Sequence, residues 1–243
     1  MLRIGIIGDY NPNFHSHPAT NAALQHAGAR LGIDVETTWV PTESLLESGY
    51  ENRLADYDRL FASPGSPYLS FEGMLRGIEF ARTRNWPFVG TCGGFQHTLV
   101  EYARNVLGIA DADSGEHDSA SKNIVITPVA CAVPNRAPNA PKLSGAGRVR
   151  IEEGSLLRTI YDSDAVDEEY FCNYEVNPEY EGKLGAAGLR VTARGADGEA
   201  RAVEMSGHPF FVATLFQPQL SSTPDRPHPV FLAYLLGRGS VLS

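Results

Sequence analysis

The sequence has little cysteine, no cluster of basic residues and no long apolar run, and each absence excludes a class of protein. The 243 residues include three cysteines, an odd number, and no two of them are close in the sequence. We therefore expect no disulfide framework and a reducing, cytoplasmic compartment. The formal charge is −9 and no run of lysine and arginine interrupts it, which argues against nucleic acid or an anionic membrane as a partner. No stretch approaches the length of a membrane span.

The sequence also lacks the usual signatures of a cofactor. No phosphate-binding P-loop pattern occurs, and no His/Cys spacing suits zinc. His15 and His17 share one loop, but two ligands in a loop are weak grounds for a metal site. We expect no metal and no cofactor, and a small molecule as the partner. Whether the chain assembles with copies of itself is left open.

What is present is the pattern of one α/β domain over residues 1–243, because 42% of the residues are hydrophobic and apolar strands alternate with amphipathic helices. Strands are expected at 2–8, 34–40, 57–62, 88–91, 124–133, 148–151, 189–192 and 210–216. Helices are expected at 19–31, 71–84, 94–107 and 230–236, and a loop rich in Pro, Gly, Ala and Asn at 135–147. This order predicts a flavodoxin-like, doubly wound and mostly parallel sheet with helices on both faces.

Cys92 is the strongest candidate for a reactive group. It lies in residues 87–96, which read Pro-Phe-Val-Gly-Thr-Cys-Gly-Gly-Phe-Gln: a short strand, a cysteine followed by two glycines, and the start of a helix. A nucleophile on a sharp strand-to-helix turn needs small neighbours, because the turn is strained and the side chain must project into open space. The helix amino terminus behind a cysteine favours the thiolate. A buried structural cysteine is the alternative, and the glycine context favours the nucleophile.

Several further segments show a specific resemblance to a known family. Residues 101–108 read Glu-Tyr-Ala-Arg-Asn-Val-Leu-Gly, 174–177 read Tyr-Glu-Val-Asn, and 208–213 read His-Pro-Phe-Phe-Val-Ala. Residues 72–74, 79–82, 113–116, 222–224 and 228–231 fit the same pattern. With Cys92, these segments resemble the glutamine amidotransferase domain of CTP synthase, within the class I (triad) amidotransferases. The resemblance runs nearly end to end.

The resemblance implies a link to pyrimidine nucleotide biosynthesis, but only through part of that enzyme. In the family, the amidotransferase is joined to an amino-terminal synthetase domain that binds ATP and UTP. The present sequence contains no such domain and reads as a stand-alone, divergent homologue. We therefore do not expect these residues alone to make CTP.

The resemblance also assigns roles to individual residues. Cys92 falls on the family's nucleophile, which attacks the side-chain amide of glutamine to give a thioester and ammonia. The backbone amides of Gly65 and Gly93 fall where the family holds the oxyanion, although an ordinary turn at Gly65 is an equal alternative. Pro67, which replaces a glycine of that loop, has no amide proton.

Glutamine recognition is only partly retained. Gln96, Glu116 and Tyr174 match substrate-binding positions of the family. The position before Tyr174, where the family has an arginine, is the neutral Asn173. An arginine binds a carboxylate with charge and two parallel hydrogen bonds, which asparagine cannot reproduce. Free glutamine would therefore lose its main anchor.

The family's catalytic base and its orienting carboxylate are replaced. In the family, the base and the carboxylate lie in a Phe-His-Pro-Glu motif. The matching residues 216–219 read Phe-Gln-Pro-Gln, so Gln217 and Gln219 occupy the two triad positions. Glutamine takes no proton at neutral pH and sets no histidine tautomer. His117 and His15 are the best substitutes, because both lie on segments expected to reach Cys92, although a surface or capping role is the simpler alternative for each.

Three functions remain open at this stage. The first is a cysteine-dependent hydrolase or transferase that acts on a small amide, or a related carbonyl compound, other than free glutamine. The second is a non-catalytic module that binds a metabolite or regulates another protein. The third is a glutaminase subunit that supplies ammonia to a separate synthetase.

Overall fold

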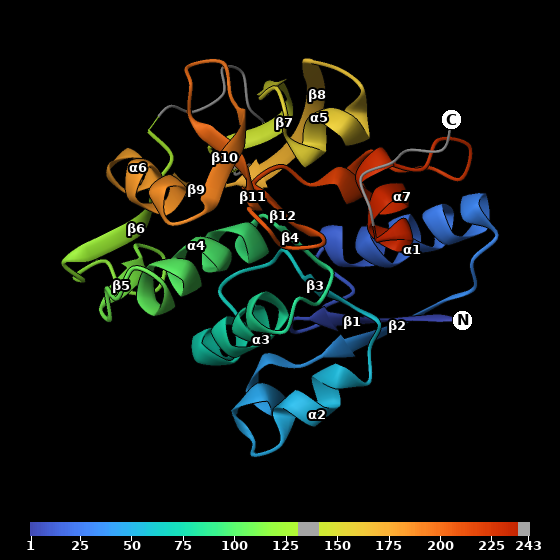
Figure 1. Ribbon diagram of the computed structural model, residues 1–243, viewed down its shortest axis with the longest axis horizontal. Helices are drawn as coiled ribbons and strands as arrows, with labels where there is room; N and C mark the ends of the chain where they lie inside the picture. The colour runs from blue at the N-terminus through green and yellow to red at the C-terminus, as the bar shows by residue number, and fades with distance from the viewer. Residues whose placement is uncertain (131–140, 238–243) are drawn as a thin grey trace.

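A single large sheet organises the chain. The computed structural model describes residues 1–130 and 141–237. Nine strands form this sheet in the order β2-β1-β3-β4-β12-β11-β10-β7-β8, and three more form a small sheet, β5-β6-β9 (Figure 1). The described segments contain no helix that is long and apolar enough to traverse a lipid bilayer.

The half of the large sheet that begins at β2 is parallel. Every neighbouring pair from β2 to β12 runs in the same direction. The bounds of these strands are β1 Leu2–Ile7, β2 Val35–Val40, β3 Arg59–Ala62, β4 Phe88–Thr91 and β12 Phe211–Thr214. Because parallel strands end at the same edge, the loops after β1, β3, β4 and β12 gather there. This half confirms the doubly wound α/β fold that the sequence predicts.

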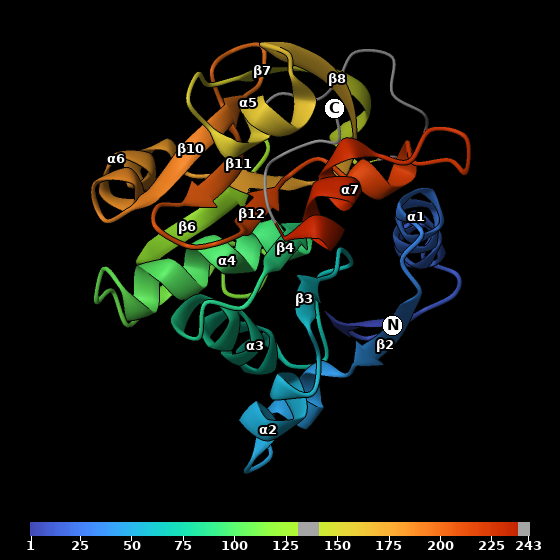
Figure 2. The same ribbon diagram turned by 45° about the vertical axis from the view of Figure 1, so that its right-hand side comes forward.

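Helices cover both faces of the parallel strands. α3 (Phe71–Thr83) and α4 (Gly93–Asn105) pack together on one face, and α1 (Ser16–Leu31) and α7 (Pro229–Leu236) pack together on the other (Figures 1 and 2). The buried positions of α3 recur at helical spacing, which explains why it lies flat on the sheet. α4 is buried over almost its whole length, because the small sheet covers the side that faces away from the large one.

Beyond β12 the same sheet continues with antiparallel strands. Their bounds are β11 Ala200–Met205, β10 Leu189–Arg194, β7 Leu143–Ile151 and β8 Ala165–Cys172. The small sheet consists of β5 Ala112–Ser114, β6 Asn123–Pro128 and β9 Tyr174–Val176. The remaining elements are 3-10 helices at Thr42–Leu46 and Pro218–Leu220 and helices α2 Tyr50–Ala55, α5 Leu156–Tyr161 and α6 Pro178–Ala186. The chain between β8 and β9 crosses the edge where the parallel strands end.

The second half of the sequence was predicted less well than the first. The loop expected at 135–147 is wrong for residues 143–147, which form the start of β7 and pair with the end of β8. Its residues 135–140 lie outside the described segments. The glycines of this strand conceal it in the sequence, because glycine disfavours strands and only pairing with β8 compensates. The strands β8 and β11 were not predicted.

One buried ion pair joins α3 to α4. The carboxylate of Glu101 is inaccessible to solvent and accepts three hydrogen bonds from Arg82, at 2.7 to 3.1 Å. Asn105 donates a further hydrogen bond to the same carboxylate at 3.0 Å. With these four hydrogen bonds in place, the pair holds α4, which carries the candidate nucleophile at its start, against its neighbouring helix.

Glu101→Ala should therefore lower the free energy of unfolding by about 3–5 kcal/mol, because it leaves Arg82 without its partner. Glu47→Ala is the matched control: it breaks the exposed pair with Arg53 and should cost less than about 1 kcal/mol. Urea denaturation of both variants and the parent chain measures the difference. Equal midpoints for the two variants would contradict the structural importance of the buried pair.

Candidate active site

Cys92 lies at a strained turn between β4 and α4. Its backbone has φ 50° and ψ −106°, a conformation that non-glycine residues rarely adopt. The cost is about 1–3 kcal/mol, so the turn persists only because its surroundings fix it. The Cys92 amide donates to the Thr214 carbonyl of β12 at 2.9 Å, and the Cys92 carbonyl accepts from the Gln96 amide at 3.0 Å. The predicted strand–turn–helix geometry is thus present, with the side chain aimed away from both elements.

The glycine after this turn is required by close packing. A Cβ atom on Gly94 would lie 2.3 Å from the carbonyl oxygen of Ala62 in β3. No side chain fits at that distance, so α4 begins directly on the backbone of the neighbouring strand. This contact explains one of the two small residues that follow Cys92 in the sequence.

The two proposed oxyanion amides lie in one corner. Gly65 has φ 101°, and a Cβ on Gly93 would lie 3.1 Å from the amide nitrogen of Ser66. The loop is fixed from beneath by His17, whose Nε2 hydrogen-bonds the Pro64 carbonyl at 3.0 Å. The backbones that carry Gly65 and Gly93 are therefore adjacent, although their role in holding an oxyanion stays a prediction.

A cavity of about 120 Å³ opens in front of Cys92. The candidate nucleophile, the loop after β3, the chain from the end of β8 to the start of β9 and four residues from other segments line it. The lining residues are Phe14, Gly65, Ser66, Cys92, Gln96, Glu116, Pro141, Phe171, Cys172, Asn173 and Tyr174. Gln96 is buried, and its Nε2 donates to the Tyr174 carbonyl at 3.0 Å. Its Oε1 is also buried and has no hydrogen-bond partner among the described residues. Gln96 therefore lines the cavity while its Oε1 stays buried.

Both acceptor groups of Asn173 are engaged within the protein. Its carbonyl accepts from the Val129 amide at 2.8 Å, and its Oδ1 accepts from the Lys142 amide at 3.0 Å. Its side-chain NH₂ is the group that it can offer to a ligand in the cavity. That group is a neutral donor, so it offers a carboxylate no charge.

A second thiol lies against the Cys92 sulfur. The Sγ atoms of Cys92 and Cys172 are 2.7 Å apart, and both cysteines are free. The Cys172 thiol can also donate to the Leu215 carbonyl at 3.4 Å, and burial raises its pKa well above the usual value for cysteine. No sequence pattern predicts a role for Cys172 in the site. Its one signal was its place directly before Asn173, a position already assigned to the substrate pocket.

The two glutamines at the predicted triad positions form a buried chain of amides. Gln217 Nε2 donates to the Phe171 carbonyl at 3.4 Å, and the Cys92 thiol points at the same carbonyl from 3.7 Å. Gln219 Nε2 lies 3.3 Å from Gln217 Oε1 and 3.2 Å from the Thr91 hydroxyl. The side chain of Gln217 thus lies close to the candidate nucleophile, but neither glutamine can accept a proton at neutral pH.

His15 lies near the cavity and His17 does not face it. The exposed His15 ring packs edge-on against Phe171, a cavity residue, at 4.7 Å between centroids. His17 is buried, and its Nδ1 accepts from the Asn11 amide at 3.0 Å. Burial lowers the pKa of His17, so it stays neutral with Nε2–H donating to the loop at Pro64.

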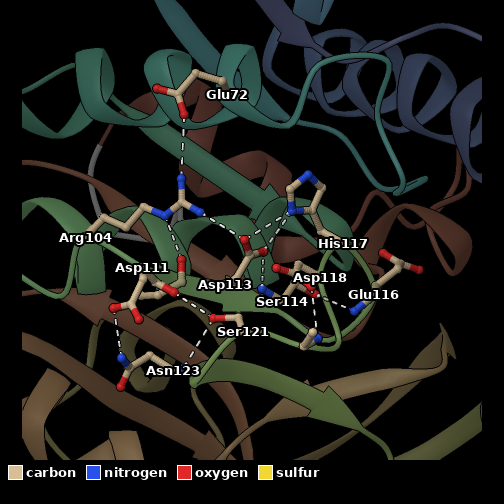
Figure 3. Close-up of polar contacts among 12 residues, drawn as sticks. Glu72, Arg104, Asp111, Asp113, Ser114, Glu116, His117, Asp118, Ser121 and Asn123 are labelled. Carbon is tan, nitrogen blue, oxygen red and sulfur yellow. Dashed lines mark hydrogen bonds and ion pairs between the residues drawn. The ribbon is translucent and has the colours of Figure 1, made fainter.

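His117 is engaged by Asp113 and Phe71 and not by the Cys92 sulfur. Its Nδ1 lies 3.0 Å from a carboxylate oxygen of Asp113, and its ring stacks on Phe71 at 4.0 Å between centroids. Figure 3 shows the imidazole turned toward Asp113 while Glu116 extends to the other side. Within residues 1–130 and 141–237, the hydrogen-bond partners of the Cys92 sulfur include no imidazole.

The comparisons with known proteins decide the family. Residues 16–236 match the family described as Glutamine amidotransferase class-I. The chain belongs to the class I glutamine amidotransferases. It is 35% identical over 237 residues to a CTP synthase of Methanopyrus kandleri and 34% identical over 235 residues to one of Sulfolobus acidocaldarius. Each alignment covers 96% of this chain but 44% of the relative, so the chain spans less than half the length of these relatives.

A solved structure supports the same relationship. The glutaminase domain of Trypanosoma brucei CTPS with bound acivicin superposes with a TM-score of 0.87 at 28% identity. The match covers 98% of this chain and 93% of that one. A glutamine amidotransferase from Thermotoga maritima shares the fold at a TM-score of 0.58 and 11% identity, over 97% of this chain and 95% of that one. The predicted resemblance to the glutaminase domain of CTP synthase is thereby confirmed.

The fold brings most of the predicted site residues around one cavity. Cys92, Gly65, Gln96, Glu116, Asn173 and Tyr174 line it, and Gly93 adjoins it at the start of α4. Gln217 lies just behind it, and His15 borders it through Phe171. His117 belongs instead to a smaller pocket with Tyr68, Phe71 and His97. In the described segments, no three His, Cys, Asp or Glu side chains come together as a metal ion would require.

A buried histidine lies directly beneath the turn that carries Cys92. His97 is 3% exposed, and its Nδ1 hydrogen-bonds the Gly93 carbonyl at 2.8 Å. Burial lowers the pKa of His97 to about 4. The neutral ring therefore donates Nδ1–H to Gly93 and stabilises the first turn of α4.

The stability of the fold should accordingly decrease in mild acid. An unfolded histidine binds a proton near pH 6.5, whereas His97 in the fold does so only near pH 4. The unfolded state binds more protons between these values, so the free energy of unfolding should fall by up to about 1.4 kcal/mol per pH unit from this residue. The substitution His97→Gln keeps a hydrogen-bond donor in the side chain and removes the group that titrates. Denaturation curves recorded from pH 7 to 4 should show a shallower loss for the variant, and parallel losses would contradict the assignment.

Proposed function

We propose that this chain is a cysteine-dependent hydrolase or transferase whose substrate is a small amide, or a related carbonyl compound, other than free glutamine. The observation that carries the proposal is the position of Cys92, a strained residue whose thiol lines a cavity with an unpartnered buried acceptor, Gln96 Oε1. Backbone strain of this kind persists where it serves function, because a structural cysteine needs none of it. The proposal treats residues 1–243 as one domain in a reducing compartment.

The proposed reaction is acyl transfer through a thioester. The Cys92 sulfur forms a bond to the substrate carbonyl carbon, while the amides of Gly65 and Gly93 hold the developing oxyanion. The carbon–nitrogen bond then breaks, and the amine leaves with a proton. Water, or another acceptor nucleophile, attacks the thioester and releases Cys92. Each step needs a proton carrier near the sulfur.

His15 and His117 remain the proposed proton carriers. His15 borders the cavity through Phe171, and His117 follows Glu116, which lines the cavity. Either imidazole would act through a bridging water, because catalytic hydrogen bonds in unliganded enzymes are often long and tighten only when substrate binds. Of the two, His15 is favoured because the Asp113 carboxylate already engages the His117 ring.

The uncharged Asn173 supports a substrate other than free glutamine, while Glu116 contributes a carboxylate to the cavity lining. Asn173 offers one uncharged donor where a free amino acid would need a cation for its carboxylate. Gln96, which lines the cavity, carries a buried and unpartnered side-chain oxygen, and we propose that it accepts the NH of an amide once a substrate binds. We therefore propose a primary amide without an adjacent carboxylate as the substrate class.

A non-catalytic binding module is the second candidate. It is favoured by the buried, mutually hydrogen-bonded Gln217 and Gln219, which supply no acid or base behind Cys92. A glutaminase subunit that feeds ammonia to a separate synthetase is the third, and it is supported by the relatives named CTP synthase. We propose that the replaced triad disfavours it.

Cys92→Ala should abolish ammonia release from the preferred amide, by about 10³-fold or more, because it removes the thiol that forms the thioester. The assay compares the parent chain and the variant on small primary amides and on L-glutamine, with circular dichroism to verify folding. Turnover that is unchanged by the substitution would exclude the enzyme and favour the binding module. A preference for L-glutamine would favour the glutaminase subunit instead.

The double substitution Gln217→His with Gln219→Glu should raise the rate of amide hydrolysis by about 10²–10⁴-fold, because it introduces a general base near Cys92. The side chains of Gln217 and Cys92 both contact the Phe171 carbonyl, so a histidine at 217 would lie close to the thiol. Gln219→Glu alone is the matched control, since it adds charge without a base. A single-turnover measurement of ammonia release compares the three chains. Rates that do not change would show that the base alone does not limit this site.

A further inference from the structure

We propose that Cys92 and Cys172 are a redox-active pair that forms a reversible disulfide when a hydroperoxide enters the cavity. The two cysteines are 80 residues apart in the chain, one at the turn after β4 and the other at the end of β8. Their sulfurs are 2.7 Å apart, and neither is engaged in another covalent bond. A disulfide requires a separation near 2.05 Å, so the sulfurs need to approach by only about 0.7 Å.

The surroundings of the two thiols assign them different roles. Both line the cavity, but Cys92 is 8% exposed and Cys172 only 3%. We assign Cys92 as the sulfur that reacts with the oxidant. Cys172 hydrogen-bonds the Leu215 carbonyl and burial raises its pKa, so it is the less reactive thiol and acts second, on the oxidised Cys92.

The chemistry balances in two steps. The Cys92 sulfur attacks the outer oxygen of the hydroperoxide: an S–O bond forms, the O–O bond breaks, and the alcohol or water leaves with a proton, which gives a sulfenic acid. The Cys172 sulfur then attacks the Cys92 sulfur, so that an S–S bond forms, the S–O bond breaks, and water leaves with the Cys172 proton. Two thiols lose two electrons in total and the hydroperoxide gains them. A dithiol reductant reverses the change by exchange.

The disulfide would switch off the nucleophile. A sulfur bonded to Cys172 cannot attack a carbonyl, so oxidation should stop acyl transfer at Cys92. This inhibitory consequence rests on the proposed function, whereas formation of the disulfide does not. The bond would also close a long loop between β4 and β8, which should make the oxidised chain more resistant to unfolding.

The test uses the full chain treated with one equivalent of hydrogen peroxide, then denatured and alkylated. The number of free thiols should fall from three to one, and peptide mass spectrometry should find Cys92 joined to Cys172. Dithiothreitol should restore all the thiols. Cys131→Ser is the matched control and should still form the bridge, whereas Cys172→Ser should yield a sulfenic acid at Cys92 that dimedone traps. The oxidised parent should also unfold at higher denaturant than the oxidised Cys172→Ser variant.

Two outcomes would overturn the proposal. One is oxidation of Cys92 to sulfinic acid in the parent chain with no bridged peptide. The other is an identical product from the parent and from Cys172→Ser. If the bridge forms but the reduced chain turns over no amide, the proposed function fails while the redox pair stands. If the reduced chain is active and peroxide leaves its activity intact, the pair does not control the site.

Discussion

The fold and the candidate site both depend on the turn at Cys92. A non-glycine residue at φ 50° is costly by itself, so the turn exists only because β12 binds its amide and α4 rests on the backbone of β3. Gly94 makes the second contact possible, since any side chain there would overlap the Ala62 carbonyl. These constraints hold the sulfur at the edge where the parallel strands end and where their loops enclose a cavity.

The cavity is walled by residues that the chain supplies from widely separated segments. The oxyanion loop follows β3, Gln96 belongs to α4, and Asn173 joins the antiparallel half of the large sheet to the small sheet. The lining includes the uncharged amide of Asn173 and the carboxylate of Glu116. Behind it, the amides of Gln217 and Gln219 bond to each other.

The end of β8 shapes the surroundings of Cys92. It places Cys172 against Cys92, and both cysteines line the cavity. The same strand end brings the Phe171 carbonyl to the Cys92 thiol and to Gln217. Residues from β8 and from α4 therefore meet around the candidate nucleophile.

The sequence by itself determined the parallel half of the fold, the family and the turn at Cys92, because these depend on local patterns: apolar runs, helical spacing, and glycines beside a cysteine. It also identified Gln96, Glu116 and Asn173 as neighbours of that cysteine. Only the tertiary structure decided that residues 143–147 form a strand, that His117 turns toward Asp113, and that Cys172 lies against Cys92. Strand pairing and side-chain direction depend on contacts between residues far apart in the chain, and no local pattern records them.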